Sequence, residues 1–367
     1  MTFLACLPRV TRVQRDVVVI GASAGGVEAL LALVSELPAD LPATILVVLH
    51  VSASHRSVLP DMLQKRGPLP ARHARHGEPM RKGRIYVAPP DRHLIVRGST
   101  LALVNGPREN GARPAIDPLF RSAARSLGPR VIGVVLSGAL DDGTAGLQAI
   151  KRNGGLAIVQ DPAEAIISDM PRHAMERVAV DHCLGIVELA QLLPALVEEK
   201  VEPMKKVSRS ADGELRVALP GGDPPGAEGV PSAFSCPDCG GVLMELHDGE
   251  VLHFRCQIGH AFGIEALREH QEYALEGALW AALRALEEKG ALARRMAARS
   301  RHLTHLKSAD RFDDRAVSAE RQAQLVRAAL EHEAGEAPVS PAPAEKQAER
   351  RAKPRARQKS LRRGTRS

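Results

Sequence analysis

Apolar residues in the first half of the chain come in short runs that alternate with segments of helical periodicity. The runs are rich in Val, Ile and Leu, and they have the length of strands that are buried on both faces of a sheet. We expect such strands at 16–20, 43–49, 131–136 and 156–160. Between them, apolar residues three and four positions apart predict helices. The clearest of these helices are expected at 27–36 and 143–153.

Strands that alternate with helices favour an α/β fold, in which helices cover both faces of a parallel sheet. We therefore predict a doubly wound, mostly parallel, Rossmann-like sheet. Three shorter runs, at 84–88, 93–97 and 100–104, predict a small antiparallel excursion from this sheet. The pair Asp117-Pro118 predicts the start of a helix, with Asp as the N-cap and Pro at the first helical position.

The second half of the chain has a different organisation. Pro and Gly residues between 203 and 233 predict a flexible linker. Leucines three and four residues apart predict a long helix over 264–302, and a second helix is expected from about 313 to 333. The end of the chain is rich in Pro and Ala and then in Lys and Arg, a composition typical of a disordered tail.

These patterns divide the chain into six segments. They are an N-terminal extension (1–15), an α/β domain (16–200), a flexible linker (201–233), a small cysteine-containing module (234–263), a helical segment (264–335) and a disordered basic tail (336–367). Because the linker is long and rich in Pro and Gly, we expect it to give the C-terminal helices no obvious fixed docking position, and we expect the α/β domain to stay folded if the module unfolds.

The net charge of +7 is concentrated at the end of the chain. Residues 345–367 contain ten Lys or Arg and two Glu, a balance of +8, so the rest of the chain is close to neutral. The folded part therefore lacks the basic character of a nucleic-acid-binding protein, and a solvated tail is the simplest interpretation of the basic end.

Cysteine usage and hydropathy bear on the compartment. The five cysteines are an odd number, and three of them cluster late in the chain, which favours a reducing cytosol and a metal site over a disulfide framework. No apolar run approaches the roughly 20 residues that a membrane-spanning helix needs, and the first residues lack the pattern of a signal peptide. We expect a cytoplasmic protein that is not embedded in a membrane.

The turn after the first expected strand reads Gly21-Ala-Ser23-Ala-Gly25-Gly26. A dinucleotide-binding fingerprint needs glycine at the position of Ser23, so that interpretation is weak. A purely structural turn is a second interpretation, because Ser and Gly are common in tight turns. The third interpretation is a nucleophile. Gly-x-Ser-x-Gly on a sharp strand-to-helix turn exposes the hydroxyl, and the helix N-terminus offers N–H groups to a developing oxyanion.

A serine nucleophile needs a base and a carboxylate that orients the base. His50 ends the second expected strand, so in a parallel sheet it would lie at the same edge as Ser23. Asp141 and Asp142 follow the third long strand. A single Asp in this position often only caps a helix, and a single His often only ends a strand. The coincidence of Ser, His and Asp after three buried strands favours a serine hydrolase.

Short motifs follow one another in a fixed order over 16–198. They are Val-Ile-Gly-Ala-Ser-Ala-Gly-Gly (19–26), Leu-His (49–50), Gly-Arg-Ile-Tyr-Val-Ala-Pro (83–89), Asp-Arg-His (91–93), Arg-Pro-Ala-Ile-Asp (113–117), Leu-Phe (119–120), Leu-Ser-Gly (136–138), Asp-Gly (142–143), Ala-Gly (145–146) and Met-Pro-Arg (170–172). In this order and spacing they resemble the catalytic domain of the CheB-type chemotaxis methylesterases. The resemblance implies that Ser23 is the nucleophile, His50 the base and Asp142 the third member, with Asp141 only its neighbour.

The resemblance further implies the reaction. It implies a protein-glutamate methylesterase that hydrolyses glutamyl methyl esters on the cytoplasmic helices of chemotaxis receptors and deamidates certain glutamines, without a cofactor for catalysis. The backbone N–H groups of Ala24 and Ala139 would hold the oxyanion. The family's third motif typically reads Gly-Met-Gly-x-Asp-Gly, so Ala139 replaces a methionine and Leu140 replaces a glycine, a change expected to shift the loop. The fifteen residues before Asp16 are too few for a receiver domain, so we expect no receiver control.

The late cysteines form a pattern of metal ligands. Cys236 and Cys239 make a Cys-x2-Cys pair, and after sixteen intervening residues Cys256 and His260 make a Cys-x3-His pair. Three thiolates and one imidazole can surround Zn²⁺ tetrahedrally, and a site with four protein ligands is structural. A redox pair and cysteines without a shared role are the alternatives, and His253 is a substitute ligand with poorer spacing.

Two other functions compete with the methylesterase. The chain could be a non-catalytic signalling adaptor that keeps the fold and binds a partner through the zinc module and the C-terminal helices, or an esterase on another substrate. The complete set of Ser, His and Asp favours an enzyme, because an adaptor has no need of all three.

Overall fold

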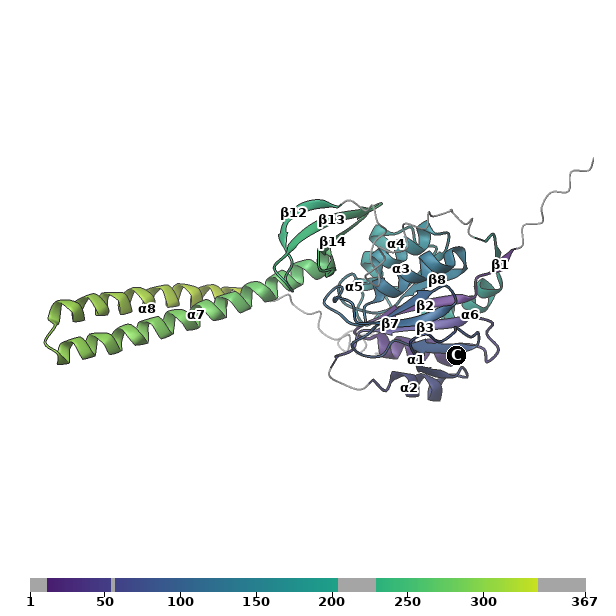
Figure 1. The fold of residues 1–367 in the computed structure, drawn as a ribbon. Coiled ribbons are helices and arrows are strands. Elements are labelled where there is room, and N and C mark those ends of the chain that lie inside the picture. Colours follow the sequence, from purple (N-terminus) through teal and green to yellow (C-terminus); the bar gives the residue numbers. More distant parts are fainter. Residues whose placement is uncertain (1–11, 54–56, 204–228, 336–367) are drawn as a thin grey trace, which may run out of the picture. The chain divides into compact units, whose positions relative to one another are not determined.

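The computed structural model describes residues 12–53, 57–203 and 229–335 (Figure 1). Most of the expected N-terminal extension, most of the linker and the whole basic tail lie outside the described residues. The chain divides into two compact units, 1–274 and 275–367. None of the helices in the described part is long and apolar enough to cross a membrane.

A seven-stranded sheet forms the centre of the first unit, and every neighbouring pair of its strands is parallel. The strand order is β10-β9-β8-β2-β3-β5-β4, and Figure 1 labels the central strands β8, β2 and β3. The strands are β2 (Val17–Ala22), β3 (Thr44–Leu49), β4 (Ala71–His73), β5 (Arg84–Val87), β8 (Val131–Val135), β9 (Leu156–Gln160) and β10 (His182–Leu184). The predicted doubly wound parallel sheet is therefore confirmed.

Helices cover both faces of this sheet, as Figure 1 shows. On one face lie α1 (Gly26–Glu36), α2 (Leu59–Arg66) and α6 (Ile186–Glu198). On the other face lie α3 (Ile116–Leu127), α4 (Thr144–Arg152) and α5 (Asp169–Arg177). Alternate residues of β2 and β3 enter the two apolar cores, which explains why these strands are continuously hydrophobic in sequence.

Two of our expectations about local structure are wrong. The run at 84–88 belongs to the parallel sheet as β5, and only β6 (His93–Arg97) and β7 (Thr100–Val104) form the antiparallel hairpin. Helix α3 begins two residues earlier than expected, so Asp117 lies in its first turn instead of capping it. The Asp117 side chain accepts hydrogen bonds from Gly143 N and Gly146 N at 3.1 and 2.7 Å. It therefore caps α4, a contact between distant segments that local sequence cannot show.

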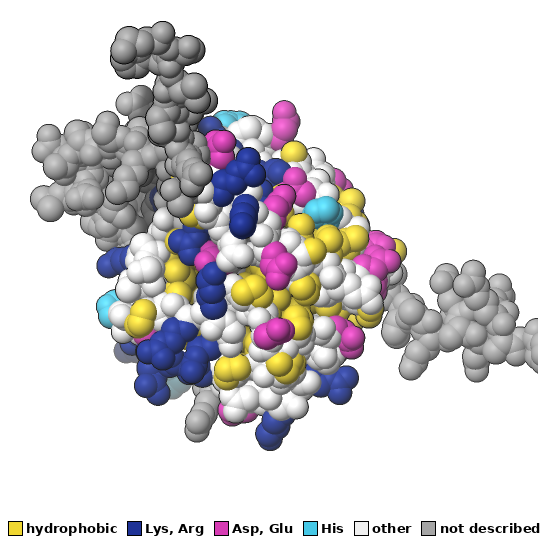
Figure 2. All heavy atoms as spheres, turned by 90° about the vertical axis from the view of Figure 1, so that its right-hand side faces the viewer, with side chains coloured by type: hydrophobic (Ala, Val, Ile, Leu, Met, Phe, Trp, Pro, Cys, Tyr) yellow, Lys and Arg dark blue, Asp and Glu magenta, His cyan; other side chains and the backbone are white. Residues whose placement is uncertain are grey.

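Short elements complete the α/β part of this unit. Strands β1 (Val13–Gln14) and β11 (Lys200–Val201) pair antiparallel, so the two ends of the α/β segment meet. A 3₁₀ turn, Gly128–Arg130, leads from α3 into β8. The face seen in Figure 2 carries Lys and Arg side chains with Asp and Glu side chains among them, in agreement with the near-neutral balance outside the tail.

The cysteine module is a four-stranded antiparallel sheet, which we call the ribbon. Its strands, in spatial order, are β12 (Val230–Ser235), β13 (Val242–Asp248), β14 (Val251–Cys256) and β15 (Ala261–Gly263). Helix α7 (Ile264–His302) follows β15 directly and has the predicted bounds. Helix α8 (Leu306–Gly335) begins earlier than expected and pairs with α7 in the second unit through Leu283, Ala323 and Leu330.

The ribbon contacts the α/β domain within the first unit. Val251 of β14 is 3% exposed and belongs to the apolar core of the α/β domain. Arg152 of α4 pairs with Asp248 of β13, and Arg255 lies 3.8 Å from the buried Glu109. Packing and ion pairs therefore join the ribbon to the α/β domain.

Candidate active site and metal cluster

Ser23, His50 and Asp142 meet at the carboxyl edge of the parallel sheet. Ser23 follows β2, His50 follows β3, and Asp142 follows β8 after a loop. The backbone keeps the sheet pairing beyond the strand ends, since Ser23 N donates to Ser137 O at 2.9 Å and His50 N donates to Ala22 O at 3.1 Å. From β2 the chain proceeds to strands on both sides, and ligand sites of doubly wound sheets occur at such a point.

The three side chains form one continuous hydrogen-bonded row. His50 Nδ1 lies 3.1 Å from Ser23 Oγ, and His50 Nε2 lies 2.7 Å from Asp142 Oδ2. A carboxylate only accepts, so the proton of a neutral His50 resides on Nε2. Nδ1 is then free to accept the hydroxyl proton of Ser23, and the arrangement can perform nucleophilic acyl transfer.

Asp142 is held by four donors. Besides His50, its oxygens accept from Ile116 N at 2.7 Å, Asp117 N at 3.1 Å and Asn110 Nδ2 at 2.9 Å. Two of these amides belong to the first turn of α3, where the helix dipole favours a negative charge. Burial by itself would raise the pKa of Asp142, but the hydrogen bonds and charge of His50 and the other donors lower it overall.

A second buried carboxylate, Asp117, lies behind the first. It accepts from Asn110 Nδ2 at 3.3 Å as well as from the start of α4. Burial and the charge of Asp142 raise the pKa of Asp117 well above its usual range, although Arg121 acts in the opposite direction. Asn110 thus bridges two carboxylates whose pKa values are shifted apart.

The nucleophile turn is tightly packed. Gly25 has φ of 73°, and a Cβ there would lie 2.7 Å from Ser137 Oγ, so a side chain is excluded both by conformation and by space. A Cβ on Gly138 would lie 2.8 Å from Ser23 Cβ. The loop that carries Ala139 is therefore in contact with the nucleophile. Ala24 and Ala139 are both exposed, at the surface of this edge.

Asp141 faces a different element from Asp142. Its carboxylate is 4% exposed and lies 3.1 Å from Arg177 of α5. It also accepts from Glu265 N and Ala266 N, both at 3.4 Å, in the first turn of α7. Burial raises the pKa of Asp141 in spite of Arg177. Asp141 therefore caps α7 and makes no contact of this kind with His50.

Sequence reasoning missed Asn110 and the true role of Asp117. Asn110 has φ of 51°, a conformation that Asn tolerates better than most residues, and it stands before Gly111 with φ of 70°. An Asn-Gly pair is a turn signal in sequence, but nothing local indicates that the amide reaches Asp142, thirty-two residues away.

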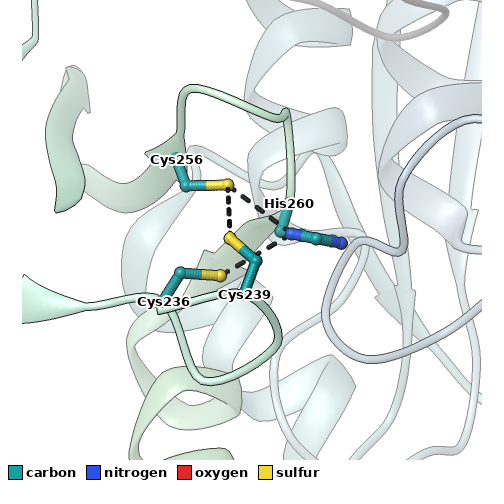
Figure 3. Close-up of side chains that lie close together, drawn as sticks. All are labelled: Cys236, Cys239, Cys256 and His260. Carbon is teal, nitrogen blue, oxygen red and sulfur yellow. Dashed lines mark hydrogen bonds between the residues drawn. The ribbon is translucent and has the colours of Figure 1, made fainter. Parts of the chain in front are cut away.

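The four proposed metal ligands lie together at the end of the ribbon (Figure 3). Their ligand atoms are all within 4.8 Å of one another, and the cluster contains His260 and not His253. Both pairs lie on tight turns. Gly240 N donates to Cys236 O at 2.8 Å, and Gly259 N donates to Cys256 O at 3.0 Å.

Three of the six distances between ligand atoms match those of a tetrahedral zinc site. Bonds of about 2.3 Å to sulfur and about 2.0 Å to nitrogen place the ligand atoms of a tetrahedron roughly 3.5–3.8 Å apart. His260 Nδ1 lies 3.7 Å from Cys236 Sγ and 3.5 Å from Cys256 Sγ, and Cys239 Sγ lies 3.7 Å from Cys256 Sγ. Asp238 Oδ2 lies 3.8 Å from the other nitrogen of His260, on the side where a carboxylate supports a ligating imidazole.

Comparison with known proteins places the α/β domain in one family. A family model described as CheB methylesterase matches residues 18–193. A protein of Leptospira interrogans named putative protein-glutamate methylesterase/protein-glutamine glutaminase is 38% identical over 188 residues, 51% of this chain and 97% of that protein. A protein-glutamate methylesterase/protein-glutamine glutaminase 2 of Anaeromyxobacter dehalogenans is 43% identical over 181 residues.

The extent of the matches differs between relatives. The match to the Anaeromyxobacter protein covers 49% of this chain and 53% of that protein, so the chain spans about half of that relative's length. The crystal structure of the Thermotoga maritima CheB methylesterase catalytic domain is 31% identical, with a TM-score of 0.48; the match covers 50% of this chain and 100% of that one.

Proposed function

Because the chain belongs to the CheB methylesterase family, we propose that it is a protein-glutamate methylesterase in which Ser23, His50 and Asp142 are the catalytic triad. The observation that supports this most is the row from Ser23 Oγ through both ring nitrogens of His50 to Asp142. The substrates are glutamyl methyl esters on the cytoplasmic helices of chemotaxis receptors, and glutamine side chains are a second substrate of the same chemistry.

The geometry supports a role for each member of the triad. Ser23 Oγ attacks the ester carbonyl while His50 Nδ1 takes its proton, and Asp142 stabilises the imidazolium through Nε2–H. His50 then returns the proton to the leaving methoxide, which departs as methanol. Water, activated by the same ring, hydrolyses the acyl-enzyme and regenerates Ser23. No cofactor takes part in these steps.

The oxyanion would be held by two backbone donors. Ala24 N follows the nucleophile at the start of α1, and Ala139 N lies on the loop that contacts Ser23 through Gly138. Both residues are exposed, so a substrate carbonyl can approach them. Replacement of the family's methionine by Ala139 leaves a backbone donor in place.

The ribbon would hold a structural zinc ion through Cys236, Cys239, Cys256 and His260. Four protein ligands leave no open position, so the ion stabilises the two turns and contributes no step to ester hydrolysis. Helices α7 and α8 would offer a surface to a signalling partner.

Release of methanol from a methylated receptor fragment tests the function. The full chain is compared with Ser23→Ala and with Ser35→Ala, a control serine that bonds only within α1, to Ala32 O. We expect methanol from the parent chain and from Ser35→Ala, and a loss on the order of 10⁴-fold for Ser23→Ala. Binding to receptor without any methanol release would instead support the signalling adaptor.

A fluorophosphonate probe separates a wrong substrate from a wrong mechanism. Such a probe labels an activated serine whatever the natural ester is. Labelling of Ser23 without methanol release would show an esterase with another substrate. Absence of both would overturn the triad itself.

A further inference from the structure

Asn110 connects the ribbon with the active site. Its side-chain Oδ1 accepts from Gly263 N at 2.7 Å, and its backbone N donates to Ala261 O at 2.7 Å. Both partners belong to β15, the last strand of the ribbon. Asn110 is 8% exposed, so these bonds are shielded from water.

The other half of the Asn110 amide reaches the proposed triad. Its Nδ2 donates to Asp142 Oδ1 at 2.9 Å, while Asp142 Oδ2 accepts from His50. Through its oxygen and its nitrogen, the Asn110 amide therefore connects β15 with Asp142, the carboxylate that orients the base. Because the amide is planar and rigid, a change in the position of Gly263 changes the direction of the bond to Asp142.

A second contact fixes the same junction. Asp141, the residue before Asp142, caps α7 directly after Gly263, and Arg177 pairs with both Asp141 and Glu265 at 3.1 Å. A Cβ on Gly263 would lie only 2.2 Å from Asp141 Oδ2. The loop before the triad carboxylate and the start of α7 are therefore in van der Waals contact.

Leu140 adds an apolar contact at the position where the family typically has glycine. Its φ is 65°, which is unfavourable for a branched side chain. Its side chain packs on the apolar cluster of the ribbon, which includes Cys236, Cys256 and Phe262. The departure from the family motif thus coincides with the place where the ribbon docks, and the contact offsets the backbone strain.

We propose that the ribbon is a positioning element of the catalytic triad and that Asn110 transmits its position to Asp142. This inference rests on the proposed function and adds to it a form of control. His260, a proposed zinc ligand, directly precedes Ala261, so a metal that fixes the Cys256–His260 turn also fixes the start of β15. Loss of the metal would then reduce catalysis without touching Ser23, His50 or Asp142.

The test is a double-mutant cycle in the full chain. Asn110→Gly removes the amide and suits a φ of 51°. Gly263→Ala disturbs the junction and leaves all four metal ligands intact. Gly277→Ala is the control, since a Cβ there meets nothing within 4 Å. Methanol release gives kcat and KM, the fluorophosphonate labelling rate reads the triad without the natural substrate, and zinc content and circular dichroism report the fold.

We expect Asn110→Gly to lower kcat and the labelling rate by roughly 10–100-fold, the equivalent of one hydrogen bond to a charged group, with KM within about twofold. Gly263→Ala should lower kcat severalfold, and the double variant should lose less than the product of the two single losses, because part of the Gly263→Ala effect passes through Asn110. Zinc content should stay the same in all of them, and Gly277→Ala should match the parent.

Two outcomes would overturn the proposal, and a third would separate it from the proposed function. If folded Asn110→Gly or Gly263→Ala kept the parent kcat, the ribbon would not position the triad. If the two losses were additive, the ribbon would act by a route other than Asn110. If the parent chain released no methanol but the variants still slowed fluorophosphonate labelling, the substrate would be wrong and the positioning role would stand.

Discussion

Asp141 and Asp142 are adjacent in sequence, yet their carboxylates hold different parts of the molecule. Asp142 bonds His50 at 2.7 Å, and Asp141 caps α7 and pairs with Arg177 at 3.1 Å. One loop after β8 therefore connects the proposed triad with the ribbon and its following helix. Substitutions of Asp141 and Asp142 separate these two functions of the loop.

The first prediction compares the two carboxylates in catalysis. Asp142→Asn should lower kcat on the order of 10⁴-fold. An Asn amide can donate to Nε2 as well as accept from it, so it no longer holds the His50 proton on that nitrogen. Asp141→Asn should stay within about tenfold of the parent, since an amide oxygen can still accept from Ala266 N. The rates of methanol release by the two variants test this difference. If both variants lost the same activity, the assignment of Asp142 as the third member of the triad would be wrong.

The second prediction concerns stability and pH. Burial raises the pKa of Asp141 in the folded protein. The stability that comes from this group is therefore complete below its pKa in the unfolded chain, and it is lost as pH rises through its pKa in the folded protein. The melting temperature of Asp141→Asn should therefore rise relative to that of the parent chain as pH rises from about 3.5 to 7.

Removal of the partner should have the opposite effect. Arg177→Met leaves a buried carboxylate without its ion pair, which should cost about 3 kcal/mol at pH 7. Because protonation of Asp141 removes that charge, the loss should shrink as pH falls. Thermal melts of both variants across this pH range test the sign. An Arg177→Met deficit that grew in acid would contradict the assignment.

The third prediction concerns Leu140. Leu140→Gly and Leu140→Ala both lose the contact with the ribbon, but only alanine keeps the strain of φ at 65°. Leu140→Ala should therefore be less stable than Leu140→Gly by about 1 kcal/mol, the reverse of the usual order of these two residues. Urea unfolding of the two variants measures the difference. The usual order would mean that the loop relaxes out of the left-handed conformation.

The fourth prediction concerns the metal. The purified chain should carry one zinc ion, and Cys236→Ser combined with Cys239→Ser should abolish its binding. Cys183→Ser is the matched control, because this exposed cysteine lies on β10 outside the cluster. Elemental analysis after gentle purification gives the stoichiometry. If the parent chain carried no bound metal, the proposal of a zinc site would be wrong.

The sequence determined the parts of the protein that depend on local pattern. Continuous apolar runs predicted the strands of a two-faced parallel sheet, because residues on both sides of such strands are buried. The position of Ser23 and His50 at the ends of two such strands predicted that they would meet. The spacing of Cys236, Cys239, Cys256 and His260 predicted a cluster, since each pair needs only one tight turn.

Tertiary structure alone decided what joins these parts. Asn110 reaches Asp142 across thirty-two residues and Gly263 across 153, and Asp117 caps a helix that begins twenty-seven residues later. A side-chain hydrogen bond leaves no periodicity in the sequence, and its partner depends on how whole elements pack. For the same reason the Pro- and Gly-rich linker suggested an independent ribbon, while buried contacts with β15 and α7 hold the ribbon against the loop that carries Asp142.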